Sequence, residues 1–398
     1  MSNLHSRAAW AACFIRTQNG GGRTAQTVHT VFKRCYNETR LQVQLTEGTD
    51  MNTIYADMTE GIDRKLMQKA GDILLSGGLV AFPTETVYGL GGNALDAEAS
   101  RKIYAAKGRP SDNPLIVHIA EFDALEQIVT KVPQEARDLA DAFWPGPMTM
   151  ILNKNDSVPA STTGGLGTVA IRMPDNEIAA EMIRAGGGYI AAPSANTSGR
   201  PSPTTAQHVK DDLDGKIDMI IDGGPVGIGV ESTIIDLTEK IPMILRPGYI
   251  NMEMLRGVLG EVRMDPGLHF NDPNFHPKAP GMKYRHYAPK APLTIVEGPQ
   301  DRVVEKIRSL TAQKESAGGK VGIIATDESA AAYDRGIVKS IGTRAEEITI
   351  SMHLYGILRD FDDLGVDVIY SEAFDTPRMG QAIMNRLIKA AGHQVIRV

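Results

Sequence analysis

Two arginines lie at the ends of apolar segments, where their charge needs a partner. Arg172 ends the run Thr168–Arg172, and Arg246 ends the run Met243–Arg246. A guanidinium that leaves water without a counter-charge costs free energy. The partner of Arg172 is therefore either a carboxylate of the chain, with Asp175 as the candidate, or an anionic ligand. Arg246 raises the same question.

Two further cations are separated by one residue in the loop Lys107–Pro114. Prolines stiffen this loop, and a buried strand is expected after it at Leu115–Ile119. Lys107 offers a point charge and Arg109 a planar fork of donors, a combination that suits a polyphosphate. The alternative is a solvated surface loop, which is the usual place for charges. His118, on the strand, is either functional or a satisfied core histidine.

Polar loops also adjoin three other predicted strands. The loop Thr84–Gly92 combines hydroxyls and a carboxylate with glycines that would let a ligand approach the backbone. Ser194 and Asn196 follow the strand Ile190–Ala192, at the kind of sheet edge where ribose and phosphate bind. The segment Gly229–Thr233 again joins glycine, carboxylate and hydroxyl at the start of a strand. Each loop taken alone is also compatible with a capped turn.

Several familiar site motifs are missing from the sequence. It contains no P-loop, no G-x-G-x-x-G before a helix, no G-x-S-x-G and no H-E-x-x-H. The only cysteines are Cys13 and Cys35, so the remaining chain has neither a thiolate zinc site nor a cysteine nucleophile. His269, His276 and His286 are not spaced as metal ligands. A nucleotide would therefore be held by an uncommon fold.

The composition is that of a globular protein with more than one domain. The chain has 398 residues, of which 42% are hydrophobic and 23% charged. This length favours two or three domains. The formal net charge of −6 excludes a global basic field for nucleic acid, and no apolar run reaches the roughly 18 residues of a membrane helix.

The first half of the chain predicts a mixed, twisted sheet with flanking helices, an α/β fold. Strands and helices alternate irregularly, and several strands follow one another closely. The helices are expected at Ile62–Leu75, Ala97–Ala106, Glu135–Phe143, Ile178–Ala185 and Met252–Leu259. The strands outside those already named are expected at Asn52–Asp57, Leu79–Pro83, Met148–Leu152, Met219–Asp222 and Ser232–Asp236.

The second part of the chain differs in pattern. Residues 264–292 are rich in proline and aromatics without a helical period, which predicts a long linker. Residues 293–398 alternate regularly between strands and helices, which predicts a smaller, doubly wound, Rossmann-like domain. The domains are thus expected at 51–263 and 293–398.

The N-terminal tail is basic and has no acidic residue from Met1 to Tyr36. One interpretation is an organelle transit peptide. The favoured one is translation from an upstream start, with Met51 as the natural start, because Gly20–Gly22 would break an amphipathic helix. Residues 1–50 are then a disordered, dispensable extension.

Taken together, the polar loops resemble the threonylcarbamoyl-AMP synthase family and its YrdC-like catalytic domain. The resemblance covers about Asp57–Gly260, and the segments after it resemble the long, two-domain branch of that family. Six ordered motifs carry it: PTETVYGLG, KGRPSDNPLIVH, TVAIRMP, APSANTSGRPSPT, DGGPVGIGVESTI and LRPG.

The resemblance implies a reaction and its participants. L-threonine, bicarbonate and ATP would form threonylcarbamoyl-AMP and pyrophosphate, with Mg²⁺ sharing the phosphate charge. A downstream transferase would then modify the adenosine beside the anticodon of certain tRNAs. The enzyme would be cytoplasmic, without a membrane or stable nucleic-acid contact. The alternative is a non-catalytic RNA-binding module of the same fold.

The resemblance also implies roles for particular residues. Lys107 and Arg109 would be the catalytic cations, and no residue is implied as a metal ligand. Threonine would contact Thr86, His118, Arg172, Ala192 and Ser232. ATP would contact Arg109, Asn113, Thr168, Ser194, Ser202, Arg246 and Tyr287. The linker, with Lys283, Tyr284, Arg285 and Tyr287, is expected to act either as a lid or as a spacer.

Overall fold

The structure is a computed structural model that describes residues 52–269 and 286–398. Its strands form two sheets, one of eleven strands and one of five. We refer to residues 52–269 as the N-terminal domain and to residues 286–398 as the C-terminal domain. The expectations for residues 1–50 and for Lys283, Tyr284 and Arg285 lie outside the described residues. Within the described ranges, every helix is too short or too polar to cross a bilayer.

The N-terminal sheet is mixed, as the irregular order of its elements predicts. Its order is β1-β8-β2-β3-β7-β4-β6-β5-β9-β10-β11, with both parallel and antiparallel neighbours. The strands are β1 (Ile54–Asp57), β2 (Val80–Phe82), β3 (Gly89–Asn93), β4 (Ile116–His118), β5 (Met148–Asn153), β6 (Thr168–Arg172), β7 (Ile190–Ala192), β8 (Met219–Asp222), β9 (Thr233–Asp236), β10 (Met243–Arg246) and β11 (Arg263–Met264).

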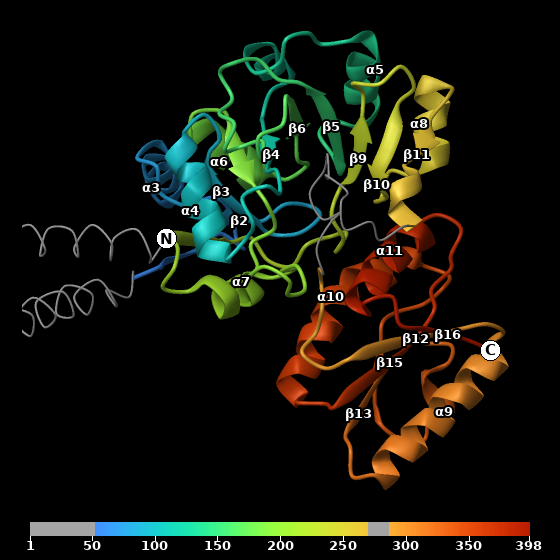
Figure 1. The fold of residues 1–398 in the computed structure, drawn as a ribbon. Helices are drawn as coiled ribbons and strands as arrows, with labels where there is room; N and C mark the ends of the chain where they lie inside the picture. The colour runs from blue at the N-terminus through green and yellow to red at the C-terminus, as the bar shows by residue number, and fades with distance from the viewer. Residues whose placement is uncertain (1–51, 270–285) are drawn as a thin grey trace, which may run out of the picture. The chain divides into compact units, whose positions relative to one another are not determined.

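Helices cover both faces of this sheet, because the side chains of a buried strand point alternately to each face (Figure 1). In β2, Val80 and Phe82 pack with α3 and α6, whereas Ala81 belongs to the cluster that contains α4, α5 and α8. The helices are α3 (Arg64–Leu75), α4 (Ala97–Lys107), α5 (Gln134–Phe143), α6 (Glu177–Ala185), α7 (Ala206–Leu213) and α8 (Met252–Leu259), with short 3-10 turns at Phe122–Gln127 and Pro266–His269.

Strand β3 occupies a segment that we predicted as a loop open to a ligand. Its glycines instead make room for neighbouring protein atoms. A Cβ on Gly91 would lie 2.9 Å from Ile190, and one on Gly92 would lie 3.1 Å from Ile103. Only Gly89 in this strand lines the pocket described below. Glycine therefore serves sheet packing here more than ligand approach.

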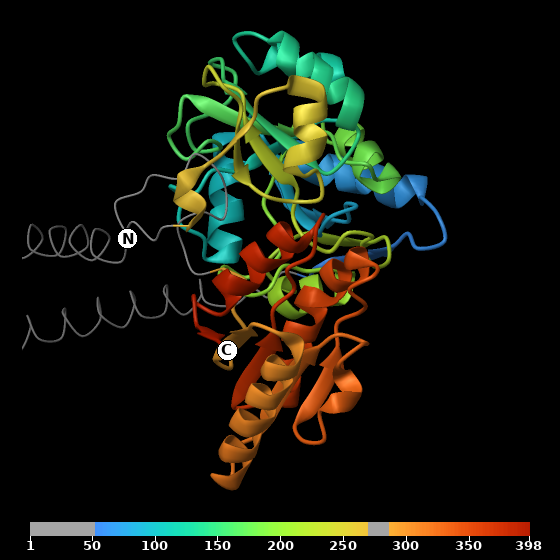
Figure 2. The same ribbon diagram turned by 90° about the vertical axis from the view of Figure 1, so that its right-hand side faces the viewer.

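The C-terminal domain has the predicted doubly wound sheet, in which all paired strands are parallel. The sheet order is β14-β13-β15-β12-β16. Helix α9 covers one face, and α10 and α11 cover the other (Figures 1 and 2). The elements are β12 (Leu293–Glu297), α9 (Gln300–Ser316), β13 (Val321–Ala325), a 3-10 turn (Ala330–Ala332), β14 (Ile337–Ser340), α10 (Glu347–Leu364), β15 (Val368–Glu372), α11 (Gly380–Ala390) and β16 (Val395–Arg397).

Helices α10 and α11 also pack against loops of the N-terminal domain. Val87, Ile228 and Val230 belong to the same buried apolar cluster as both helices. The Ser351 hydroxyl on α10 donates a hydrogen bond to the Ile228 carbonyl at 2.7 Å. Arg359, also on α10, pairs with Asp212 of α7 at 3.0 Å. The two domains thus share a core with polar contacts across it.

We expect Gly229→Ala to weaken this packing. Gly229 has a φ of +87°, and a Cβ there would lie 2.3 Å from the Ser351 carbonyl oxygen. Left-handed strain and overpacking each cost about 1–3 kcal/mol, so the free energy of unfolding should fall by at least about 2 kcal/mol in urea titrations.

Gly227→Ala is the matched control for this substitution. A Cβ at Gly227 meets nothing within 4 Å, and its φ lies outside the left-handed region. This variant should unfold at the wild-type urea concentration or slightly above it. Equal midpoints for the two variants would contradict the proposed packing.

Candidate active site

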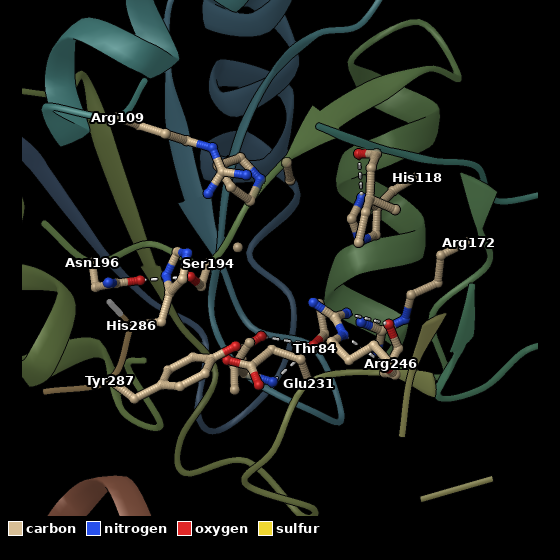
Figure 3. A pocket seen from close by; sticks show the side chains of 16 residues that line it. Thr84, Arg109, His118, Arg172, Ser194, Asn196, Glu231, Arg246, His286 and Tyr287 are labelled. Carbon is tan, nitrogen blue, oxygen red and sulfur yellow. Dashed lines mark hydrogen bonds between the residues drawn. The ribbon is translucent and has the colours of Figure 1, made fainter. Parts of the chain in front are cut away.

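One pocket, lined mainly by residues of the N-terminal domain, collects most of the predicted site residues (Figure 3). It lies where several strands end and their following loops converge. Eight predicted residues line it: Arg109, His118, Arg172, Ala192, Ser194, Ser232, Arg246 and Tyr287. The other lining residues are Thr84, Val87, Gly89, Ile116, Pro193, Asn196, Glu231 and His286.

His118 and Arg172 are neighbours because β4 and β6 are parallel and in register at these two residues. The chain partner of Arg172 is Glu85, at 2.7 Å, which corrects the expectation of Asp175. The two side chains form an ion pair without an aligned hydrogen bond, so Nε and Nη2 of Arg172 keep donor capacity. Arg172 is only 4% exposed. A ligand carboxylate would therefore find a desolvated guanidinium here.

His118 is neutral in this site. Burial, and then the nearby charge of Arg172, lowers the pKa of His118 to about 3. Its Nδ1 lies 3.1 Å from the Ile116 carbonyl oxygen, which assigns the proton to Nδ1. The Phe82 ring packs against it edge-on, with ring centroids 5.9 Å apart. Nε2 is then left as a hydrogen-bond acceptor.

Arg246 is fixed by Ser232, the residue that precedes the neighbouring strand β9. Its Nε donates to the Ser232 carbonyl at 3.0 Å, and its Nη2 donates to the Ser232 hydroxyl at 3.1 Å. The Ser232 hydroxyl also lies 2.7 Å from the Thr149 hydroxyl. Burial lowers the pKa of Arg246 to about 10, so it remains a cation at neutral pH.

Lys107 and Arg109 leave the end of α4 in different directions. Gly108 adopts a left-handed φ of 61° and ends the helix between them. Arg109 reaches the pocket, while its Nε and Nη2 donate to the carbonyls of Asn113 and Pro114 at 3.3 and 3.1 Å. Burial lowers the pKa of Arg109 to about 10, so it also stays charged at neutral pH.

Lys107 is buried and turns away from the pocket lining. Its Nζ donates to the carbonyls of Ser194, at 2.5 Å, and of Asn196. The Ser194 hydroxyl in turn donates to the Asn196 side-chain oxygen at 2.5 Å. The structure thus gives Lys107 a role in holding this loop. A direct contact between Lys107 and phosphate stays a prediction.

Tyr287 reaches the pocket from the segment before β12. It is one of two described non-glycine residues with positive φ, at 65°. Its ring stacks on Tyr355 of α10, with centroids 5.2 Å apart. His286 lines the pocket beside it, and its Nε2 has no hydrogen-bond partner. Such an uncommon backbone conformation at a pocket is typical of a functional position.

Four predicted contact residues do not line the pocket. Thr86 is buried behind it, with its hydroxyl 2.9 Å from that of Thr84. Asn113 is buried, and its side-chain oxygen has no hydrogen-bond partner. Thr168 begins β6, at the opposite end from Arg172. Ser202 donates to Glu231 at 2.6 Å. Their predicted contacts with substrates remain untested.

The sequence reasoning missed two acidic residues: Glu231, which lines the pocket, and Glu85, which pairs with the lining residue Arg172. Each lies within a loop that the sequence analysis singled out, where it was mentioned only as a carboxylate among hydroxyls and glycines. A signal was available, because a carboxylate beside apolar strands needs a cation as much as an arginine needs an anion. Spacing along the chain does not identify the partners: Glu231 pairs with Arg386 of α11 at 3.0 Å.

Among residues 52–269 and 286–398, no three histidine, cysteine or acidic side chains cluster in a way that could hold a metal ion. The carboxylates of Glu85 and Glu231 are paired with Arg172 and Arg386.

Acid should destabilise the fold between pH 7.5 and 5.5. Burial lowers the pKa of His118 and of His286 to about 3, whereas an unfolded histidine titrates near 6.5. The unfolded state therefore binds protons first as the pH falls, which favours unfolding. Each buried histidine should remove about 1 kcal/mol of stability at pH 5.5.

Urea unfolding at several pH values measures this effect. His118→Gln should flatten the dependence by about one proton. The pKa of Glu231 is about 2, so its stabilisation is lost only below about pH 4.5, outside this window. A wild-type stability that is constant from pH 7.5 to 5.5 would exclude neutral buried histidines.

These observations define a two-domain α/β protein with a pocket lined by three arginines, two of them buried, a class suited to anionic substrates. Two family models match the chain. Residues 72–248 match the Sua5/YciO/YrdC model, whose description is telomere recombination. Residues 250–392 match the model of the threonylcarbamoyl-AMP synthase C-terminal domain.

Relatives of known name extend over most of the chain. The threonylcarbamoyl-AMP synthase of Pyrococcus abyssi is 50% identical over 346 residues, which cover 87% of this chain and 100% of that protein. The enzyme of that name from Bacillus subtilis is also 50% identical, covering 86% of this chain and 98% of the relative. The chain belongs to the threonylcarbamoyl-AMP synthase family.

The fold agrees with solved structures of the same family. Sua5 of Pyrococcus abyssi complexed with L-threonine is 49% identical, with a TM-score of 0.83, and the match covers 87% of this chain and 100% of that one. A variant of that Sua5 with a histidine and a tyrosine replaced by alanine also has a TM-score of 0.83, at 48% identity.

Proposed function

We propose that this chain is a threonylcarbamoyl-AMP synthase, which converts L-threonine, bicarbonate and ATP to threonylcarbamoyl-AMP and pyrophosphate. The observation that carries the proposal is the convergence of Arg109, Arg172 and Arg246 on one pocket with His118 and Ser232. Both substrates are anions, and a desolvated pocket with several cations offsets their mutual repulsion. Family membership and the threonine complex of a relative support the same reaction.

The threonine end of the site is proposed around Arg172. Its unused donors suit the threonine carboxylate, and Nε2 of neutral His118 suits a proton of the amine or hydroxyl group. The hydroxyl of Ser232 provides a further polar contact, and Ala192 leaves room for the methyl group. Thr86 is included among the threonine-binding residues because its hydroxyl is within hydrogen-bond distance of the hydroxyl of Thr84, which lines the pocket.

The nucleotide end is proposed around Arg109 and Arg246, which remain cationic at neutral pH. Tyr287 offers an aromatic face to the base. Lys107 contributes by holding the loop that carries Ser194. Four further ATP contacts complete the proposed set: Asn113, Thr168, Ser194 and Ser202.

The chemistry requires no protein nucleophile. The threonine amine attacks the carbon of bicarbonate, and water leaves to give a carbamate. A carbamate oxygen then attacks the α-phosphorus of ATP, and pyrophosphate leaves. The residues contribute orientation and charge stabilisation, which can account for a large part of a rate enhancement.

Three broader points belong to the proposal. Mg²⁺ is proposed as the ion that ATP carries, because Mg²⁺ is commonly held through substrate phosphates and no cluster of three metal-ligating side chains occurs among the described residues. A separate transferase would move the threonylcarbamoyl group to tRNA, and we assign the chain to the cytoplasm, where these substrates meet. As functional divisions, which are narrower than the structural domains named above, we propose a catalytic part (51–263), a linker (264–292) and a C-terminal part (293–398).

Pyrophosphate release from ATP tests the proposal. Omitting L-threonine or bicarbonate in turn should abolish release, and mass spectrometry should detect threonylcarbamoyl-AMP only in the complete mixture. Release that does not depend on threonine would exclude the proposed reaction. A non-catalytic RNA-binding module would release no pyrophosphate and would retain labelled RNA on a filter.

A further inference from the structure

A cluster of polar residues joins the pocket to the C-terminal domain. Its centre is Glu231, which lines the pocket and is only 7% exposed. The Arg386 Nε on α11 donates to Glu231 Oε2 at 3.0 Å. The Tyr355 hydroxyl on α10 donates to the same carboxylate at 3.0 and 3.2 Å, and Ser202 adds a third donor. The C-terminal domain therefore neutralises a carboxylate of the pocket.

Arg386 also holds the backbone on both sides of the Arg246 site. Its Nη2 donates to the Glu231 carbonyl at 3.1 Å, and its Nη1 donates to the Pro247 carbonyl. Glu231 precedes Ser232, and Pro247 follows Arg246, so one buried side chain ties together the two segments that carry these residues. Arg386 itself is fully buried and does not line the pocket.

The electrostatic consequence follows from the neighbours of Glu231. Burial alone would raise its pKa, but Arg386, then Arg246 and the Ser202 hydroxyl, lower the pKa of Glu231 to about 2. Glu231 is therefore ionised at neutral pH, and its negative charge interacts with both Arg386 and Arg246. Without Arg386, the carboxylate would lose its strongest counter-charge, would draw more on Arg246 and Lys389, and would repel an anion in the same pocket.

We propose that Arg386 of the C-terminal domain is a positioning residue for the nucleotide site: it takes up the charge of Glu231 and thereby leaves Arg246 available to the phosphates of ATP. Tyr355 assists by its hydrogen bonds to Glu231 and by stacking on Tyr287. Helices α10 and α11 thus set the affinity for ATP without touching it. This inference rests on the proposed function, because it assumes that ATP binds in this pocket.

The test measures ATP binding by calorimetry, and KM and kcat by pyrophosphate release, in the full-length protein. Arg386→Met should raise the Kd and KM for ATP about tenfold or more, with a much smaller change in kcat. Adding Glu231→Gln should restore the Kd to within about threefold of the Glu231→Gln single variant, because the repulsive charge is then gone. Arg386→Lys should retain more affinity than Arg386→Met, because it keeps the charge but not the planar fork of donors.

Arg359→Met is the matched control. Like Arg386, Arg359 is a buried arginine of a C-terminal helix, here α10, and it pairs with an acidic residue of the N-terminal domain, Asp212. Any loss of ATP affinity in this variant should persist when Glu231→Gln is added. If Glu231→Gln rescues neither variant, or both equally, Arg386 acts only as a structural contact and the inference fails.

The experiment distinguishes failure of the proposed function from failure of this inference alone. If wild-type protein binds no ATP, the proposed function fails. If it binds ATP and folded Arg386→Met binds it equally well, only this inference fails. Should Arg386→Met not fold, Tyr355→Phe takes its place, since it removes two hydrogen bonds to Glu231 and keeps the ring. Tyr355→Phe should raise the Kd for ATP, again reversibly by Glu231→Gln, and an unchanged Kd would overturn the proposal.

Discussion

Replacing Arg109 with alanine is expected to lower kcat/KM for ATP by about 30- to 700-fold. The guanidinium lines the pocket and stays charged at neutral pH, although burial lowers its pKa to about 10. Losing a desolvated charge partner of a phosphate costs about 2–4 kcal/mol of transition-state stabilisation. Steady-state pyrophosphate release at varied ATP concentration measures the effect.

Arg101→Ala is the control for Arg109→Ala. Arg101 lies on α4 near Arg109 in sequence, but its side chain is 62% exposed and pairs only with Glu98 on the same helix. A surface pair of this kind contributes little. Near wild-type kcat/KM in the Arg101 variant and in the Arg109 variant alike would remove Arg109 from the site.

Arg172→Ala should act mainly on threonine. We expect kcat/KM for threonine to fall by about 30- to 700-fold, the same 2–4 kcal/mol, whereas the Kd for ATP alone should change little. The separation follows from position: Arg172 is paired with Glu85 beside His118, apart from the segment that carries Arg109. Varying threonine at saturating ATP, with binding of ATP measured separately, gives both quantities.

A second variant separates substrate binding from the ion pair. Arg172→Ala leaves Glu85 buried without its cation, which destabilises the fold and repels the threonine carboxylate. Arg172→Ala combined with Glu85→Gln removes that repulsion and should recover stability. It should not recover full threonine affinity, because the guanidinium is still missing. Full recovery would mean that Arg172 serves only to neutralise Glu85.

The regular elements were predictable because their patterns are local. Buried strands such as β6 and β10, and amphipathic helices such as α8, have the predicted bounds. Strand β3 was missed because its composition, Gly-Leu-Gly-Gly-Asn, is that of a loop, and only the neighbouring Phe82 and Ile190 explain the glycines. Helix α7 was missed because it follows a run rich in proline and hydroxyl residues.

The site was predictable in its cations but not in its pairings. Arg172 and Arg246 were identified because a charge at the end of a buried strand requires an explanation. Their surroundings depend on contacts that are distant in sequence. Glu231 and Arg386 are 155 residues apart, and no local pattern relates them. The contact of Lys107 with phosphate stays a prediction; what the sequence could not indicate is that its ammonium donates to carbonyls of the loop after β7.

The apolar cluster shared by Val87, Ile228 and Val230 with the C-terminal helices limits modular exchange between relatives. A chimera that joins this N-terminal domain to a foreign C-terminal domain would bring unmatched side-chain volumes to a close-packed seam. It would also bring an unmatched partner to Gly229, where the backbone of α10 approaches closely. The two halves of such a hybrid would have to be taken as a pair, with the loop before β9 inherited from the same parent as α10.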